Sequence, residues 1–274
     1  MVVKSAISLL LLNFCQVNAL GKLWGHIKPP AYKDNDELSV KVGQLWSLVA
    51  AIQPYDFYSL NWCQSKAGHV FDQSKFKNKD HYGSDNSDVN NKVHESPYTW
   101  TVGEQDGGKV VCNRLLQESE QRQFVEMIRN RYRYQLFLDD LPNSTLLRDP
   151  LTDEHIENFK EGIFVGNHNP DGSIYIHNHL EFIVKVHHVH GGDEVRIVGF
   201  EVEQHSIATG SSLEPEFLHR QPKQYLRSST GKLTDISEGI LFSYSWKTVN
   251  DESTTWKHRL DHYYEMGKYD VHMK

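Results

Sequence analysis

Residues 180–202 read LEFIVKVHHVHGGDEVRIVGFEV, and this segment is the most informative about the architecture of the chain. Every second position from Leu180 to Val186 is apolar, which is the period of a strand buried on one face. Residues 191–193 are Gly-Gly-Asp, a turn signal, and the alternation returns over residues 195–202. The segment therefore predicts a β-hairpin.

The same alternation predicts further strands at residues 38–48, 93–102, 110–116 and 240–247. Residues 117–130 have helical spacing instead, with Phe124, Met127 and Ile128 on one face and Ser119 as the expected N-terminal cap. Long polar connections are expected at residues 64–96 and 205–238. The sequence thus predicts an all-β fold: an antiparallel β-sandwich with one or two short helices and long polar loops.

Length and charge limit the class of protein. The chain has 274 residues, 38% of them hydrophobic and 24% charged, which is ordinary for a globular protein with a substantial core. The formal net charge is −7, and no basic stripe stands out along the sequence. We therefore expect no nucleic-acid partner.

The first residues indicate the cellular compartment. Lys4 precedes an apolar run over residues 5–17, and Val17-Asn18-Ala19 supplies the residue types that signal peptidase requires. This pattern predicts a secretory signal peptide over residues 1–19, followed by a single luminal domain over residues 20–274. An uncleaved N-terminal anchor is the alternative. No later stretch is apolar over the length of a membrane span.

Two cysteines are expected in the mature chain, because the third, Cys15, lies in the predicted signal peptide. In an oxidising compartment, Cys63 and Cys112 would form one disulfide. That bond would contribute roughly 4 kcal/mol in the chain-entropy treatment. Two separate buried thiols are the alternative.

One glycosylation sequon, Asn143-Ser144-Thr145, follows Leu141-Pro142. A secreted chain would be open to modification there, so glycosylation of Asn143 at a surface turn is expected.

Histidines are the most suggestive candidates for metal chemistry, and the chain has sixteen. The predicted strand geometry puts His177, His179 and His187 on one face, and imidazoles so spaced suit Zn²⁺ or Cu²⁺. No cysteine or tight set of carboxylates adjoins them to complete a site. A solvated, histidine-rich strand end is the simpler interpretation, and we expect no cofactor.

Catalytic motifs are absent from the sequence. No nucleophile elbow, phosphate loop or His-Glu-x-x-His occurs, and Asp139-Asp140 beside a Leu-Pro turn suits a strand end better than acid–base chemistry. We therefore expect that the protein is not an enzyme.

Two aromatic groups allow more than one interpretation. Tyr55, Phe57, Tyr58 and Trp62 could form a sugar-stacking platform or belong to the core, and the core is the better expectation. Towards the C-terminus, the order Trp256, Arg259, Asp261 suggests a cation–π contact with a salt bridge.

Six short segments carry a further signal when they are taken in order: residues 54–63 (PYDFYSLNWC), 140–142 (DLP), 178–182 (NHLEF), 196–202 (RIVGFEV), 242–246 (FSYSW) and 256–263 (WKHRLDHY). They resemble the luminal domain of the nonaspanins, the transmembrane 9 superfamily, and the resemblance runs from about residue 32 to 272. Two positions depart from it: Leu260 replaces a Trp, and Asn91-Lys92-Val93 stands where the family has Gly-Asp-Arg.

The resemblance implies a non-enzymatic luminal domain for Golgi and endosomal trafficking and localisation of membrane proteins. Its partners would be membrane proteins of the secretory pathway. Nonaspanins continue into nine membrane spans, so the resemblance also implies that this sequence is either a fragment lacking that half or a natural truncation. The expected location is the lumen of the secretory pathway, in Golgi or endosome, with secretion expected of a natural truncation.

Two other classes of protein are compatible with the sequence. One is a secreted module that binds carbohydrate or glycoprotein, and the other is a metal-handling or hydrolytic protein.

Overall fold

The computed structural model describes residues 29–49, 54–65, 93–104, 107–148, 155–158, 162–189 and 192–261. The predicted signal peptide and most of the polar loop at 64–96 lie outside these residues. The described strands and helices confirm the all-β class, with one α-helix among them.

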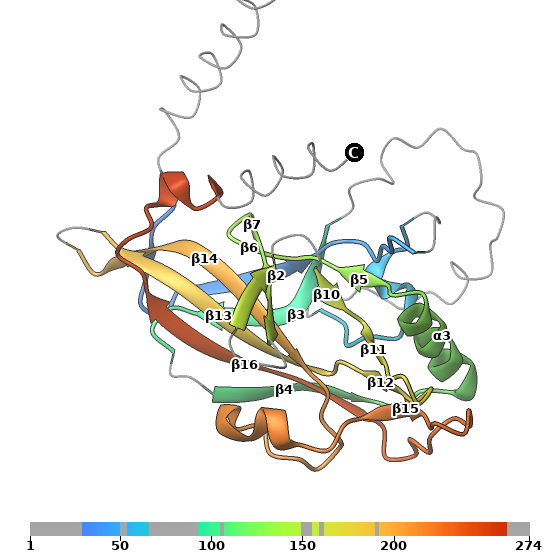
Figure 1. Cartoon of the computed structure of the whole chain (residues 1–274). Helices are drawn as coiled ribbons and strands as arrows, with labels where there is room; N and C mark the ends of the chain where they lie inside the picture. Colours follow the sequence, from blue (N-terminus) through green and yellow to red (C-terminus); the bar gives the residue numbers. More distant parts are fainter. Residues whose placement is uncertain are drawn as a thin grey trace, which may run out of the picture.

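The largest sheet contains the predicted hairpin, now seen as β13 (His179–His188) and β14 (Glu194–His205) (Figure 1). Its strands follow the order β4-β16-β13-β14-β8-β9, and β1 pairs with β14. The remaining bounds are β1 Tyr32–Lys33, β4 Gly107–Arg114, β8 Ser144–Arg148, β9 His155–Asn158 and β16 Ile240–Asn250. Strand β13 runs antiparallel to β14 but parallel to β16, and β14 runs parallel to β8. The parallel pairings were not predicted, because they join segments far apart in the sequence.

A second sheet covers one face of the first (Figure 1). Its order is β3-β2-β6-β7, with bounds β2 Glu37–Val42, β3 His94–Thr101, β6 Leu136–Leu138 and β7 Leu141–Pro142. Tyr98 of β3 lies with its ring centroid 5.4 Å from those of Phe182 and Tyr244, and Trp100 lies 6.4 Å from Trp246. These aromatic contacts fill the space between the two layers, as the sandwich prediction requires.

Helix α3 (Glu118–Arg129) packs at one end of the sandwich against the short strands β11, β12 and β15 (Figure 1). The bounds of these strands are β11 Gly166–His168, β12 Ile174–Ile176 and β15 Tyr225–Arg227. The other short elements are β5 Arg133–Tyr134, β10 Ile163–Phe164 and the 3₁₀ turns η1 Phe57–Ser59, η3 Pro215–Arg220 and η4 Trp256–His258. The predicted apolar face of α3 is buried. The predicted cap was wrong: Gln117 precedes the helix, and its backbone N–H donates to Glu120 Oε2 at 2.8 Å.

The aromatic segment at residues 55–62 belongs to the core, as expected. Phe57, Tyr58 and Trp62 are buried, and Phe57 stacks on Trp62 with centroids 5.1 Å apart. These rings are therefore not available as a sugar-stacking platform. Directly after them, a disulfide joins Cys63 to Cys112, as predicted, with a Cα–Cα distance of 5.9 Å.

A two-residue turn between β6 and β7 places Asp139 beside the buried guanidinium of Arg259. Asp139 and Asp140 have φ of 51° and 57°, the left-handed conformation of a tight hairpin turn. Asp139 Oδ2 lies 2.5 Å from Nη1 of Arg259. The predicted cation–π contact exists, with Arg259 Cζ 4.6 Å from the Trp256 ring. The predicted acid was wrong: Asp261 is exposed and pairs with His258, whereas Arg259 is buried and requires a buried partner.

The sequon does not lie at the surface, and that prediction was wrong. Asn143 is fully buried. Its Oδ1 accepts the backbone N–H of Leu136 at 2.9 Å, and its Nδ2 donates to Ser144 O and Thr145 Oγ1. A glycan on Nδ2 would require these bonds to break and this part of the core to open.

Within the described residues, no helix is both long and apolar enough to cross a membrane.

Candidate functional site

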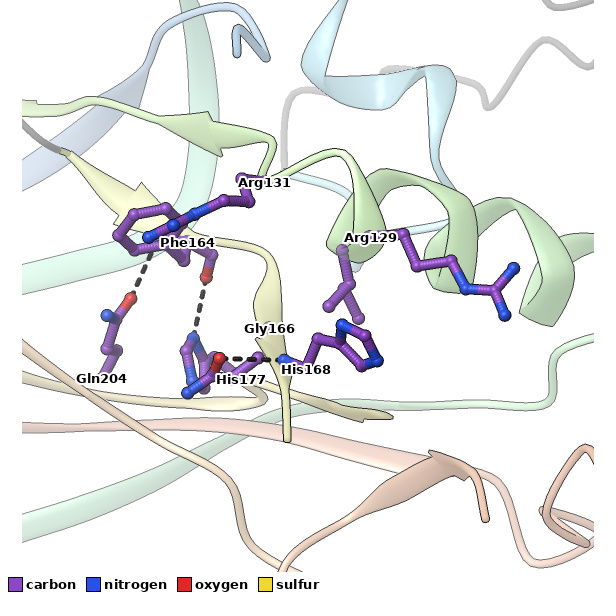
Figure 2. Close-up of a pocket in the computed structure, with 9 residues that line it drawn as sticks. Arg129, Arg131, Phe164, Gly166, His168, His177 and Gln204 are labelled. Atoms are coloured by element: carbon purple, nitrogen blue, oxygen red, sulfur yellow. Dashed lines mark hydrogen bonds between the residues drawn. The ribbon is translucent and has the colours of Figure 1, made fainter. Parts of the chain in front are cut away.

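A pocket of about 440 Å³ opens at the C-terminal end of α3 (Figure 2). Its described lining residues are Ile128, Arg129, Arg131, Phe164, Gly166, Asn167, His168, His177 and Gln204. None of these lining residues is acidic, and two are arginines. The pocket therefore presents a positive, hydrogen-bonding surface suited to a carboxylate or another anion.

Arg131 reaches the pocket from a strained backbone position. Helix α3 ends with Tyr132 N donating to Met127 O and Arg131 N donating to Ile128 O, both at 3.0 Å. In this helix ending the residue at Arg131 is left-handed and is usually glycine. Arg131 has φ 54°, a conformation that costs a side-chain-bearing residue roughly 1–2 kcal/mol. Its guanidinium lies 5.6 Å from the centre of the Phe164 ring.

His177, one of the three predicted candidates, lines this pocket but is already engaged. Its Nδ1 lies 2.9 Å from the carbonyl oxygen of Phe164, and the side chain is buried (Figure 2). The Phe164 backbone N–H donates to Gln204 Oε1 at 2.9 Å, so the two side chains together hold this strand edge. Burial lowers the pKa of His177 to about 4, and the imidazole is neutral at physiological pH.

The other two predicted candidates lie elsewhere along β13. His179 is fully buried, with Nδ1 2.8 Å from Ser243 Oγ and Nε2 3.2 Å from Ser245 Oγ. Burial, followed by the nearby His205, lowers the pKa of His179 to about 3. His187, at the opposite end of the strand, lies 3.3 Å from Asp251 O. The described structure thus gives the three histidines separate surroundings and does not gather them into one site.

A different set of ligand-type side chains does converge. Glu203 and His205 of β14 and His219 of η3 each offer an atom, and these atoms all lie within 4.8 Å of one another. Sequence reasoning missed this group. The Glu203-x-His205 spacing, which puts both side chains on one face of a strand, was an available signal. His219 gives no such signal, because it lies fourteen residues further along in a loop segment.

A family model described as endomembrane protein 70 matches residues 54–274. The chain belongs to this family. The relatives of this endomembrane protein 70 member include transmembrane 9 superfamily member 10 of Arabidopsis thaliana, at 28% identity over 90% of this chain. Member 4 of Homo sapiens is 25% identical over 90% of the chain, and member 3 of Saccharomyces cerevisiae is 24% identical over 89%.

The chain spans about two fifths of the length of these relatives, with 39% of the Arabidopsis and human proteins and 33% of the yeast protein covered. No solved structure matches it. These matches confirm the resemblance that the six ordered segments indicated, and they extend over most of this chain.

Proposed function

We propose that this chain is a non-enzymatic luminal domain that takes part in the trafficking and localisation of membrane proteins in the Golgi and endosomes. The observation that carries the proposal is the endomembrane protein 70 match over residues 54–274, together with relatives named as transmembrane 9 proteins. The Cys63–Cys112 disulfide supports a luminal location, because such bonds persist in oxidising compartments.

The pocket at the end of α3 is the surface through which this domain would contact its clients. An arginine with only a structural role at a helix end does not need a left-handed backbone. Arg131 nevertheless adopts that conformation, and its side chain lines the pocket. Arg129, in the last turn of the same helix, adds a second positive charge. Acidic luminal segments of membrane proteins have the complementary charge, and contacts of this kind are worth most where the site is partly shielded from water.

The trafficking role is tested by deleting the gene in its own cells and measuring membrane proteins at the cell surface by quantitative surface labelling. A defined set of them should be lost from the surface and restored by re-expression. The tagged protein should coincide with Golgi or endosome markers. Unchanged surface composition after deletion would refute the trafficking role.

The pocket is tested separately with the double variant Arg129→Gln/Arg131→Gln in the same rescue. The matched control is Arg122→Gln, which removes an exposed arginine of the same helix that pairs with Glu118. We expect Arg122→Gln to restore the localisation of the membrane proteins. The double variant should not restore it, although it is present at the same level as the wild type. Rescue by both would reject the pocket as the contact surface while leaving the trafficking role standing.

A further inference from the structure

Two carboxylates face each other across the central hairpin. Glu181 of β13 and Glu203 of β14 are direct register partners in the antiparallel pair, and Glu203 is buried. Like charges opposite each other on neighbouring strands repel, and burial strengthens the repulsion. A positive charge at this position would relieve that repulsion.

A buried imidazole nitrogen points into the space between these carboxylates. His205 Nε2 lies 3.5 Å from Glu181 Oε2 and 3.9 Å from Glu203 Oε1. The side chain of His205 is only 5% exposed, and within the described residues Nε2 makes no hydrogen bond. A buried nitrogen without a hydrogen bond is costly, unless another group occupies the position in front of it.

A second imidazole approaches from the connection that follows β14. His219 of η3 places Nδ1 3.6 Å from Glu203 Oε1, and its ring centroid lies 4.9 Å from that of His205. Its side chain is about one-third exposed, so this side of the group is open to solvent. An ion could enter along this side without opening the core.

We propose that Glu203, His205 and His219 bind a divalent zinc ion, with Glu181 as the fourth donor. Tetrahedral zinc with bonds of about 2.0–2.2 Å holds neighbouring donor atoms roughly 3.3 Å apart. The donor atoms of Glu203, His205 and His219 all lie within 4.8 Å of one another, and the 3.9 and 3.6 Å from Glu203 Oε1 to the two imidazoles are close to the separation that zinc requires. These three donors therefore need to approach one another by no more than about 1.5 Å. Glu181 Oε2, 3.5 Å from His205 Nε2, lies outside this group and has to move further in to complete the coordination. The ion neutralises the opposed carboxylates and occupies the position in front of His205 Nε2.

The donor set selects the metal and its role. Imidazole nitrogen with carboxylate oxygen suits Zn²⁺, whereas Ca²⁺ and Mg²⁺ prefer oxygen donors alone. Four protein ligands would close the coordination sphere, which is typical of a structural site. The ion would fasten η3 to the face of the β13–β14 hairpin.

The test uses the full chain, secreted from a eukaryotic host, stripped with EDTA and transferred to metal-free buffer. Isothermal titration with ZnCl₂ and native mass spectrometry should show one ion per chain, and the same titration with CaCl₂ or MgCl₂ should show none. His219→Gln and Glu203→Gln should each weaken zinc binding by more than roughly 100-fold. Loss of a residue that only hydrogen-bonds to a metal ligand already lowers metal affinity by about 10–100-fold, and loss of a ligand should lower it further. Zinc should raise the melting temperature of the wild type and not that of His219→Gln.

The matched control is His258→Gln, which removes an exposed histidine that pairs with one carboxylate, Asp261, outside the group. It should bind zinc as the wild type does. His219 is at the surface, so its variant is expected to fold, and circular dichroism of the metal-free proteins checks this. No zinc binding by the wild type, equal binding by both ligand variants, or equal affinity for calcium would overturn the assignment.

Discussion

Lowering the pH from about 7.5 to about 5.0 should destabilise this domain, and His177 should account for a defined part of the loss. The imidazole is buried, its Nδ1 lies 2.9 Å from Phe164 O, and its pKa is lowered to about 4 from an ordinary value of 6.5. The unfolded chain therefore binds a proton at a pH where the folded chain does not. This contribution to stability is complete above pH 6.5 and is lost as the pH falls from 6.5 towards 4.

The size of the effect follows from the two pKa values. At pH 5.0 the unfolded imidazole is almost fully protonated and the folded one is mostly neutral. Each pH unit in this window changes the free energy of unfolding by about 1.4 kcal/mol at most, so the loss between pH 7.5 and 5.0 is about 2 kcal/mol for His177.

The assay is urea unfolding at both pH values, followed by tryptophan fluorescence, for the wild type and His177→Asn. Asparagine can keep a donor near the position of Nδ1 but does not titrate. The variant should lose about 2 kcal/mol less than the wild type between the two pH values. His258→Gln, which removes an exposed imidazole, is the control and should follow the wild type.

The reasoning fails if His177→Asn and the wild type lose the same free energy over this pH interval. Equal losses would mean that His177 is protonated in the folded protein or is accessible to water. A lower stability of the variant at pH 7.5 would not affect the test, because the comparison is between pH values within each protein.

Three further predictions concern the fold. Replacing both Cys63 and Cys112 by serine should lower the free energy of unfolding by about 4 kcal/mol in urea titrations, given their sequence separation of 49 residues; a loss below about 1 kcal/mol would contradict this. Arg259→Ala should cost about 3–5 kcal/mol, because it leaves the buried carboxylate of Asp139 without its ion pair, and the same titration with Lys257→Ala, an exposed neighbour, should show little change. Asn143 should carry no glycan in the intact mass of the secreted protein, and a mass shift on endoglycosidase treatment would disprove its burial.

The local pattern of the chain was enough to predict many of its elements. Alternation from Leu180 to Val186 predicted β13, and those apolar positions are buried. The helical spacing of Phe124, Met127 and Ile128 likewise predicted α3. These predictions succeed because a half-buried strand or helix imposes its own period on the sequence.

The candidate sites were less accessible to such reasoning. His177 was singled out from sequence, but its pocket depends on arginines at the end of a helix almost fifty residues earlier. The group of Glu203, His205 and His219 depends on η3 folding back over the hairpin. Neither arrangement leaves a periodic trace, since each joins segments that are distant in the chain.

The sequence by itself determined the all-β class, the central hairpin, the helix, the disulfide and the family. Only the tertiary structure decided that β13 and β16 run parallel, that Asn143 is buried, and that Arg259 pairs with Asp139 instead of Asp261. The reason is physical. Periodicity and turn residues act over a few neighbouring positions, whereas the partner of a buried polar group is whichever complementary group the packing brings within hydrogen-bond distance.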